Sequence, residues 1–416
     1  MFNLNLTKNM INSGDTAWML ISSALVMLMT PAGLTLFYGG LTQRKSVLNT
    51  IGMSYTAFCT ASVVWVVIGY SIAFSNGNQF FGYLDHLLLH GIGINDVTGT
   101  IPTLLFVFFQ GTFAAIAVAL VSGSIIERVR YSTWFVFSIL WVVLVYSPIT
   151  HWVWGGGFLS SLGELDFAGG TVIHVNAGVS GLVLVYLLGN RSGFKNTSVR
   201  PASVKLMILG SALLWFGWFG FNGGSQFAAD GIAANALLVT NVAAASGGLG
   251  WLLIEWFSTN SKPTLIGSAS GVISRLVGIT PAAGFVDVSG ALVIGFGSGI
   301  VGYLGVVKLK QWLGYDDTLD VFGIHGLAGA FGAIMTGIFA NPNINEAGIG
   351  LLYGNPEQVL IQLTGVLVVS AYSGIATFII YKVISIFFGS GRVSEEVESE
   401  GMDMAYHGEK GFDISE

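Results

Sequence analysis

The sequence predicts an all-α polytopic membrane protein, and three features lead to that class. Of the 416 residues, 53% are hydrophobic and only 9% are charged, whereas a soluble domain carries about 25% charged residues. Continuous apolar runs recur along the whole chain, each about 20 residues long, which is the length that a helix needs to cross a bilayer. A transmembrane β-barrel would show short segments of alternating polarity instead.

Eleven apolar runs are long enough to be transmembrane helices. They cover residues 16–38, 47–73, 99–126, 131–149, 168–189, 202–224, 230–257, 263–281, 287–307, 319–340 and 358–388. The eighth is interrupted by several glycines and by Arg275. The chain holds 58 glycines, and small residues let transmembrane helices approach closely. We therefore expect a tight transmembrane domain over residues 1–388 and a charged tail over residues 389–416.

The positions of the basic residues predict the orientation of these helices, because Lys and Arg stay on the cytoplasmic side of short loops. Those that follow odd-numbered spans are Arg44, Lys45, Arg128, Arg130, Arg191, Lys195, Arg200, Lys205, Lys262, Lys308, Lys310, Lys382, Arg392 and Lys410. Only Lys8 and Arg275 depart from the pattern. We expect the N-terminus outside and the C-terminus inside.

Two stretches of the chain share the pattern I-H-x-x-A-G-x-x-G, at residues 173–181 and 324–332. The first puts His174 in the fifth span and the second puts His325 in the tenth. A repeat unit of five spans inserts its second copy upside down, so we expect inverted repeats over about 16–189 and 202–340, followed by an extra helix over 358–388. Inverted repeats are a transporter architecture in which the substrate path lies at their interface near the midplane.

Two histidines inside apolar spans need a reason, since ionisable groups in a bilayer are costly. From the helical rise of 1.5 Å per residue, His174 lies about 12 Å below Asp166, and both histidines approach the middle of the membrane from opposite sides. Neutral imidazoles there could share a hydrogen bond, accept one from a small polar solute and relay a proton. Each could also be a structural residue bonded to a backbone carbonyl. Because Cys59 is the only cysteine and no carboxylate is adjacent, we expect neither a metal site nor a cofactor.

At this point the sequence resembles the ammonium transporters of the Amt/Mep/Rh superfamily, most closely the microbial and plant Amt branch. The resemblance covers nearly the whole chain. Its strongest motif is Asp166-Phe-Ala-Gly-Gly-Thr-Val-Ile-His174-Val-Asn-Ala-Gly, and Asp320-Val-Phe-Gly-Ile-His325-Gly supplies the second histidine motif. The resemblance implies that His174 and His325 are the twin histidines of the family's pore.

The resemblance implies two further groups of site residues. Phe113 and Phe221 match the outer and inner phenylalanines of a stacked gate. The positions that match an external recruitment site for ammonium are Trp154, Ser225, Phe113 and Asp166. At Asp166 a helix N-cap is an equally good local interpretation.

These residue types suit the handling of ammonium. An aromatic face attracts a desolvated cation by up to about 2 kcal/mol. A serine hydroxyl accepts a hydrogen bond from ammonium, which potassium cannot donate. Phenylalanines that exclude water make passage of the ion costly, and losing a proton avoids that cost. The sequence therefore predicts recruitment of ammonium, its deprotonation, and conduction of ammonia with or without the proton.

The tail sequence 401–412 resembles the family's cytoplasmic C-terminal motif, although the family usually has tyrosine where this chain has Phe412. The resemblance implies a homotrimer with one pore per subunit, a multi-pass location in the cell membrane and a tail that packs under neighbouring subunits and helps to dock a PII-type regulatory protein. A solvated charged tail is the alternative. The net charge of −6 gives no indication of nucleic acid binding.

Three functions on the same fold remain open. The leading one is an ammonium transporter. The others are an ammonium sensor, whose relatives typically carry an appended signalling domain, and an Rh-like channel for neutral ammonia. A membrane enzyme is not expected, because the sequence shows no nucleophile–base pair.

Overall fold

The computed structural model describes residues 10–194, 200–257 and 262–412, and helices make up nearly all of its regular structure. Among these residues, ten helices are long and apolar enough to cross a membrane: Ser13–Leu41, Arg44–Phe74, Thr103–Ile125, Tyr131–Leu162, Gly170–Leu188, Val204–Gly224, Gly231–Phe257, Val288–Leu313, Phe322–Phe339 and Glu357–Phe388. One more apolar helix, Leu265–Ile279, is shorter.

Several of the long helices contain a wider π-helical turn, in which the hydrogen bond spans five residues. The π segments are η1 (Met29–Leu34), η3 (Trp65–Gly69), η5 (Val142–Tyr146), η6 (Gly170–Val175), η7 (Leu304–Leu309) and η8 (Phe322–Leu327). The α-helical parts beside them are α1 (Ser13–Leu28), α2 (Thr35–Leu41), α3 (Val47–Val64), α4 (Tyr70–Phe74), α6 (Tyr131–Trp141), α7 (Ser147–Val153), α9 (Asn176–Leu188), α13 (Val288–Tyr303), α14 (Lys310–Leu313) and α15 (Ala328–Phe339).

The uninterrupted long helices are α5 (Thr103–Ile125), α10 (Val204–Gly224), α11 (Gly231–Phe257) and α16 (Glu357–Phe388), and the shorter apolar helix is α12 (Leu265–Ile279). Short helices are α8 (Phe158–Leu162), α17 (Glu395–Glu400) and α18 (Met402–His407), together with the 3₁₀ turns η2 (Arg44–Ser46), η4 (Leu87–Leu89) and η9 (Leu351–Tyr353). Two-residue strands β1 (Val97–Thr98) and β2 (Ile101–Pro102) pair antiparallel.

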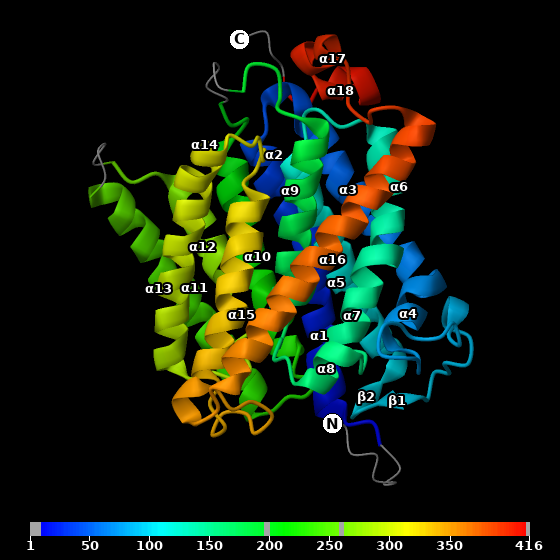
Figure 1. Ribbon diagram of the computed structural model, residues 1–416, viewed down its shortest axis with the longest axis vertical. Helices are drawn as coiled ribbons and strands as arrows, with labels where there is room; N and C mark the ends of the chain where they lie inside the picture. The colour runs from blue at the N-terminus through cyan, green and yellow to red at the C-terminus, as the bar shows by residue number, and fades with distance from the viewer. Residues whose placement is uncertain (1–9, 195–199, 258–261, 413–416) are drawn as a thin grey trace.

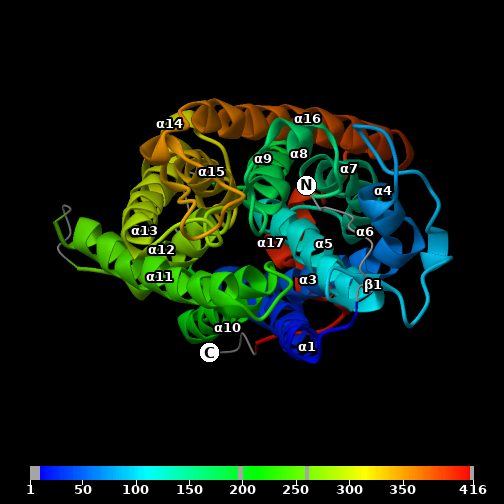
Figure 2. The ribbon, with the colours of Figure 1, turned by 90° about the horizontal axis from the view of Figure 1, so that it is seen from below.

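The helices form two groups, which are seen end-on in Figure 2. One group holds α1 to α9 and the other holds α11 to α15, while α10 packs against both α1 and α11. The α9 helix packs against η8, which joins the two groups near the centre. The last long helix, α16, runs obliquely across α15 and α9 (Figure 1). The strands β1 and β2 lie at one end of the bundle, and α17 and α18 lie at the other.

The α5 helix has the most buried span of the bundle, with 78% of its apolar window inside the protein. Its sequence is rich in alanine and small residues between Phe113 and Gly123. These side chains let α1, α3 and α9 approach on three sides. Because α5 is enclosed in this way, Phe113 points into the protein rather than toward lipid.

The helices lie where the apolar runs predicted them, with boundary differences that have local causes. The third span begins at Thr103 rather than residue 99, because Ile101 and Pro102 pair with β1. The ninth continues to Leu313 instead of ending at residue 307. The buried Arg275 lies within α12, so it is not a loop residue. Lys8, Lys195 and the tail end 413–416 lie outside the described residues.

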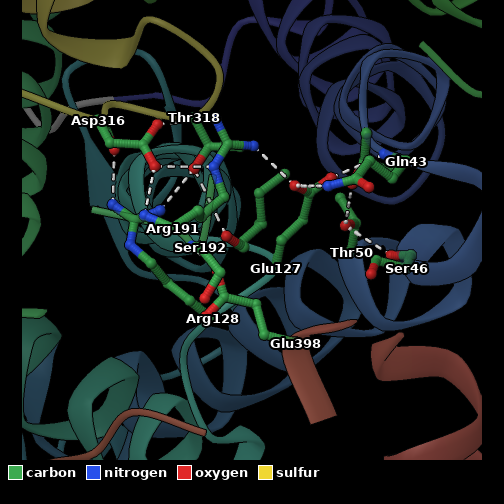
Figure 3. A network of polar contacts seen from close by, with 12 residues as sticks. Gln43, Ser46, Thr50, Glu127, Arg128, Arg191, Ser192, Asp316, Thr318 and Glu398 are labelled. Atoms are coloured by element: carbon green, nitrogen blue, oxygen red, sulfur yellow. Dashed lines mark hydrogen bonds and ion pairs between the residues drawn. The ribbon is translucent and has the colours of Figure 1, made fainter. Parts of the chain in front are cut away.

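A network of ion pairs joins the loops at the end of the bundle that carries the tail (Figure 3). The Arg191 guanidinium contacts Glu127 at 2.6 Å and Asp316 at 2.7 Å. Arg128 donates to the Thr318 hydroxyl at 2.7 Å and to the Asp316 carbonyl at 2.6 Å. The network therefore holds together loops that follow α5, α9 and α14.

The tail is packed onto its own chain at this end. The Asp403 carboxylate accepts a hydrogen bond from the Asn49 amide at the start of α3, at 2.8 Å. The Lys45 ammonium donates to the Glu398 carbonyl at 3.1 Å, and a Glu398 carboxylate oxygen accepts from the Ser192 amide at 2.6 Å. Met402 and Asp403 are buried, so this part of the tail is not a solvated segment.

Candidate functional site

Five rings form a continuous column through the centre of the bundle. Trp154 meets Phe113 edge-on, with ring centroids 6.1 Å apart. Phe113 stacks on Phe221 at 4.2 Å with only 13° between the ring planes. Phe221 lies 6.1 Å from His174, whose ring is 5.2 Å from that of His325. These side chains come from the residue after α7 and from α5, α10, η6 and η8, so the column exists only in the folded bundle.

The two histidines are held by matching local structures. His174 lies in the π turn η6 and His325 in the π turn η8. Their Nδ1 atoms are 3.2 Å apart, so a single hydrogen between these nitrogens links the two rings. Nε2 of His174 is buried and has no protein partner. Both imidazoles thus keep polar atoms in a space that is otherwise apolar.

A close backbone approach brings these two turns together. The Cα of Gly326 lies 2.4 Å from where a Cβ on Gly178 would be. Only a residue without a side chain fits between η8 and α9 at this point. Gly178 of the first histidine motif and Gly326 of the second therefore allow the close approach that brings the two imidazoles together.

A narrow cavity of about 10 Å³ lies beside the histidines, which is about the room of one water molecule. The lining residues are Leu34, Phe37, Ile116, Leu120, His174, Leu214, Trp218, Ile273 and His325. Apart from the two imidazoles and an indole, this lining is aliphatic or aromatic hydrocarbon. A small neutral solute would meet little competition from water there, whereas an ion would lose its hydration shell.

Asp166 stands behind the outer ring of the column. Its carboxylate accepts hydrogen bonds from the amides of residues 169–172, at 2.6–3.1 Å. The negative charge therefore caps η6, the turn that carries His174. The Asp166 carbonyl accepts a hydrogen bond from the Trp154 indole at 2.8 Å, which fixes that ring against Phe113. The N-cap interpretation and a role beside the column are thus compatible.

Ser225 follows the inner phenylalanine at the end of α10. Its hydroxyl donates to the Phe221 carbonyl at 2.8 Å, which leaves the oxygen lone pairs free to accept. The side chain is partly exposed. The Trp154 and Ser225 side chains are connected through Phe113 and Phe221 rather than by a direct hydrogen bond among the described contacts.

Two residues near the column were not singled out from the sequence. Trp218 stacks 5.6 Å from His174 and donates its indole hydrogen to the Thr280 hydroxyl at 2.9 Å. Its position three residues before Phe221, on the same helix face, is the signal that could have found it. Glu164, two residues before Asp166, is buried beside it. An acidic residue so close to an apolar span was a visible but unused signal.

The fold and this central site define a class: a polytopic helical membrane protein with paired histidines buried on an aromatic column. Comparison with known proteins gives the family. The model of the Ammonium Transporter Family matches residues 17–412, and the chain belongs to that family.

The relatives are similar along their whole length. The ammonium transporter of Aquifex aeolicus is 50% identical over 97% of this chain and 94% of its own. The ammonium transporter of Bacillus subtilis is 47% identical over 97% and 99%. Among solved structures, Saccharomyces cerevisiae Mep2 superposes with a TM-score of 0.85 at 36% identity, covering 93% of this chain and 88% of its own. A structure described as a sensor Amt protein has a TM-score of 0.88 at 26% identity, covering 95% and 98%.

Proposed function

We propose that this member of the Ammonium Transporter Family recruits ammonium, deprotonates it and conducts ammonia through a hydrophobic pore lined by His174 and His325. The observation that carries the proposal is the ring column, in which two stacked phenylalanines separate a tryptophan from the imidazole pair. A column of this kind suits a small cation that can lose a proton.

Recruitment occurs at the outer end, at Trp154, Ser225, Phe113 and Asp166. The rings of Trp154 and Phe113 meet edge-on and offer π faces to a cation, worth up to about 2 kcal/mol when water is excluded. The Ser225 oxygen keeps lone pairs for an N–H donor, which ammonium has and potassium lacks. The carboxylate of Asp166 adds attraction from behind the tryptophan.

Deprotonation follows from the gate formed by Phe113 and Phe221. Both rings are buried and stacked, so an ion between them would lose its hydration with no polar partner in return. Burial of an unpaired charge is far more costly than burial of a neutral amine. The ion therefore gives up its proton at the gate: ammonia passes as the neutral molecule, and the histidine pair below the gate accepts the proton.

Below the gate, the histidine pair receives ammonia and handles the proton. The unpartnered Nε2 of His174 is an available hydrogen-bonding atom. The Nδ1–Nδ1 contact offers a route by which a proton can move from one ring to the other.

We further propose the membrane topology. The protein has eleven transmembrane helices, of which α12 is the eighth. Inverted repeats cover about residues 16–189 and 202–340, and the extra helix over 358–388 follows them. The N-terminus is outside and the tail 389–416 is cytoplasmic. Support for the repeat comes from π turns in both members of two equivalent pairs, spans 4 and 9 and spans 5 and 10.

The assembly and location follow the family: a homotrimer in the cell membrane, with one pore per subunit and a PII-type regulator at the tail end. In favour of a structured docking surface, Met402 is buried and Arg44 lies 5.9 Å from the ring centroid of Phe412. Native mass spectrometry in detergent tests the trimer, and pull-down with and without residues 389–416 tests the regulator.

A sensor role is the second candidate, because a structure described as a sensor Amt protein shares the fold at a TM-score of 0.88. Both roles need the recruitment site, but only a transporter needs an open route past the gate. An Rh-like channel for neutral ammonia is distinguished by electrical measurement.

The deciding experiment compares current and ammonia flux in proteoliposomes for the wild type, His174→Ala and His90→Ala. His90 is an exposed loop histidine and serves as the matched control. Saturable current that His174→Ala abolishes and His90→Ala leaves intact supports the proposal. Flux without current supports the neutral channel, and ammonium binding with neither supports the sensor.

A further inference from the structure

The carboxyl group of Glu164 is buried next to that of Asp166, in the loop between α8 and η6. The Thr171 hydroxyl lies 2.8 Å from Oε1 of Glu164 and 2.7 Å from Oδ2 of Asp166. The other Glu164 oxygen, Oε2, is buried with no protein partner. Two acidic groups therefore share one small hydroxyl inside the protein.

The hydrogen count at this junction requires a proton on one of the two acids. The Thr171 hydroxyl has one hydrogen and can donate it to only one carboxylate. Asp166 already accepts from four backbone amides, which stabilises its charged form. Among the described contacts Glu164 accepts only from the Thr171 hydroxyl, at 2.8 Å, so Glu164 is the acid on which a proton is more stable.

The charge balance around the pair leads to the same assignment. The ion pairs in the described part of the chain are Arg191–Glu127, Arg191–Asp316, Lys310–Asp320 and Arg392–Glu398. None of them involves Glu164 or Asp166, so among the described residues no Lys or Arg forms an ion pair with either acid. Burial, together with the charge of Asp166, raises the pKa of Glu164 to about 8 against the lowering effect of the Thr171 hydrogen bond.

The neighbouring elements hold Glu164 in place without supplying charge. From α16, Gln362 binds both backbone polar groups of Leu165 at 2.7 Å, and Gln358 donates to the Gly163 carbonyl at 2.9 Å. A Cβ on Gly365 of the same helix would lie 2.3 Å from the carboxyl carbon of Glu164. The niche is therefore built to the shape of this side chain.

One other titratable group faces the acid pair. Tyr146 from η5 is in electrostatic contact with Asp166. From the segment that follows α12, the Pro281 carbonyl accepts from the Phe167 amide, and Phe285 contacts the Phe167 ring. These neighbours carry no charge at neutral pH, so protonation of Glu164 is the event that changes the charge of this loop.

We propose that Glu164 is a proton-binding site coupled to the outer recruitment site. A proton on Glu164 weakens the binding of an ammonium ion at Trp154, and a bound ammonium ion weakens the binding of that proton. The inference rests on the proposed function. The coupling runs through Asp166, whose carboxylate shares Thr171 with Glu164 and whose carbonyl holds the Trp154 indole. Ionisation of Glu164 adds a second negative charge behind the tryptophan and strengthens cation binding. By linkage, a bound cation lowers the proton affinity of Glu164 by the same factor.

The sign of the pH dependence follows directly. Below about pH 8 Glu164 is neutral and only Asp166 attracts the cation. Above that pH both acids are charged, so the KM for the ammonium ion falls as the external pH rises. A negative charge on Glu164 about 10 Å from the bound ammonium ion, near the protein surface, should change the affinity for that ion by about three- to tenfold.

The test measures the ammonium current of proteoliposomes from about pH 6.5 to 9, with KM expressed as the concentration of the ammonium ion at each pH. The wild type should show a KM that falls about three- to tenfold across this range. Glu164→Gln should keep the low-pH KM at every pH. The control Glu346→Gln removes an exposed acid and should retain the wild-type slope. A wild-type slope in Glu164→Gln would overturn the proposal.

Infrared difference spectroscopy of the purified protein gives a second measurement that needs no transport. A protonated carboxyl C=O band should be present in the wild type at about pH 6.5, disappear above about pH 9 and be absent from Glu164→Gln. It should also weaken when ammonium is added at about pH 7.5. Absence of this band overturns the proposal even if Glu164→Gln does not fold. Loss of current in every sample, with the band present, would contradict the transporter function alone.

Discussion

The Nδ1 atoms of His174 and His325 face each other at 3.2 Å, although the two residues are 151 positions apart. Neutral imidazole has one N–H, so only one of the two nitrogens donates in this contact. The second ring must then carry its hydrogen on Nε2. The neutral pair therefore exists in two states in which donor and acceptor are exchanged. Both rings change tautomer between these states, so a single ring cannot reproduce this property.

From this shared hydrogen we predict that the effects of removing the histidines are not additive. His174→Ala and His325→Ala should each reduce the ammonium current about 100-fold, as expected for a lost proton relay. The double variant should fall little further, because either deletion already breaks the pair. Currents of the four proteins in one proteoliposome preparation check this. Losses that multiply would indicate two independent sites.

The stacked pair Phe113 and Phe221 should exclude potassium. Phe221→Ala removes one of the two rings, so water enters the column and a potassium current appears, while the ratio of ammonium to potassium current falls. Removing a buried phenylalanine also costs about 3–5 kcal/mol of stability, so Phe221→Leu provides a milder opening. The control is Phe296→Ala, because Phe296 is 49% exposed on α13. Unchanged selectivity in both Phe221 variants would argue against a gate at this stack.

Arg191 should be the residue on which the tail-end network depends most. It pairs with Glu127 and Asp316, whose side chains are almost fully buried. Arg191→Ala removes the positive charge that is paired with both buried carboxylates. The two acids keep only hydrogen bonds, Glu127 from Thr42 and Gln43 and Asp316 from the residue-191 backbone amide. Breaking a buried ion pair costs about 3–5 kcal/mol. Thermal unfolding in detergent measures the loss, with exposed Arg200→Ala as the matched control. Equal melting temperatures for the two variants would contradict this role.

The same network predicts loss of stability in acid. Burial acts to raise the pKa values of Glu127 and Asp316, but both pKa values lie below their ordinary range. The charge of Arg191, with hydrogen bonds from Thr42 and Gln43, outweighs burial at Glu127, and the hydrogen bonds and charge of Arg191 outweigh it at Asp316. Acids with lowered pKa values stabilise the fold above their unfolded-state pKa, near 4, and that contribution is lost as the pH falls below it. The melting temperature should therefore drop below about pH 4 in the wild type. In Arg191→Ala this contribution should be absent.

Gly247 should be irreplaceable only while Arg275 is present. A Cβ on Gly247 would lie 1.1 Å from Cδ of Arg275, so the buried Arg275 side chain would have to move to make room for it. We expect Gly247→Ala to lower the melting temperature sharply, since overpacking in a tight core typically costs about 1–3 kcal/mol. The double variant Gly247→Ala with Arg275→Ala should regain most of that loss. Failure of this rescue would mean that another neighbour sets the limit.

Much of the helical framework could be predicted from the sequence, because long apolar runs have few alternatives to transmembrane helices. The proximity of the two histidines also followed from their echoed motifs. The π turns could not be predicted in this way, since hydropathy is insensitive to one extra residue per turn. Trp218 was not predicted for a different reason: in a chain with 13% aromatic residues, its spacing of three residues from Phe221 is too common among apolar runs to single it out.

For the acid pair, the local sequence predicts the role of Asp166 but not the environment of Glu164. Asp166 could be assigned as a cap from its sequence alone, and its bonds to the η6 amides agree with that. The environment of Glu164 depends instead on Gly365 and two glutamines of α16, about 200 positions later in the chain. Burial of a polar group by a distant helix leaves no local trace in the sequence.

The π turns that carry the two imidazoles make the chain unusually sensitive to its length at those points. A π turn holds one residue more than an α turn. Deleting any one residue of Gly170–Val175 or Phe322–Leu327 would restore regular winding and rotate the helix on one side of the cut by about 100° relative to the other. One imidazole would then swing away from its partner while every remaining side chain kept its identity. In each half of the protein, the number of residues in the π turn therefore matters as much as the identity of the residues in the histidine motif.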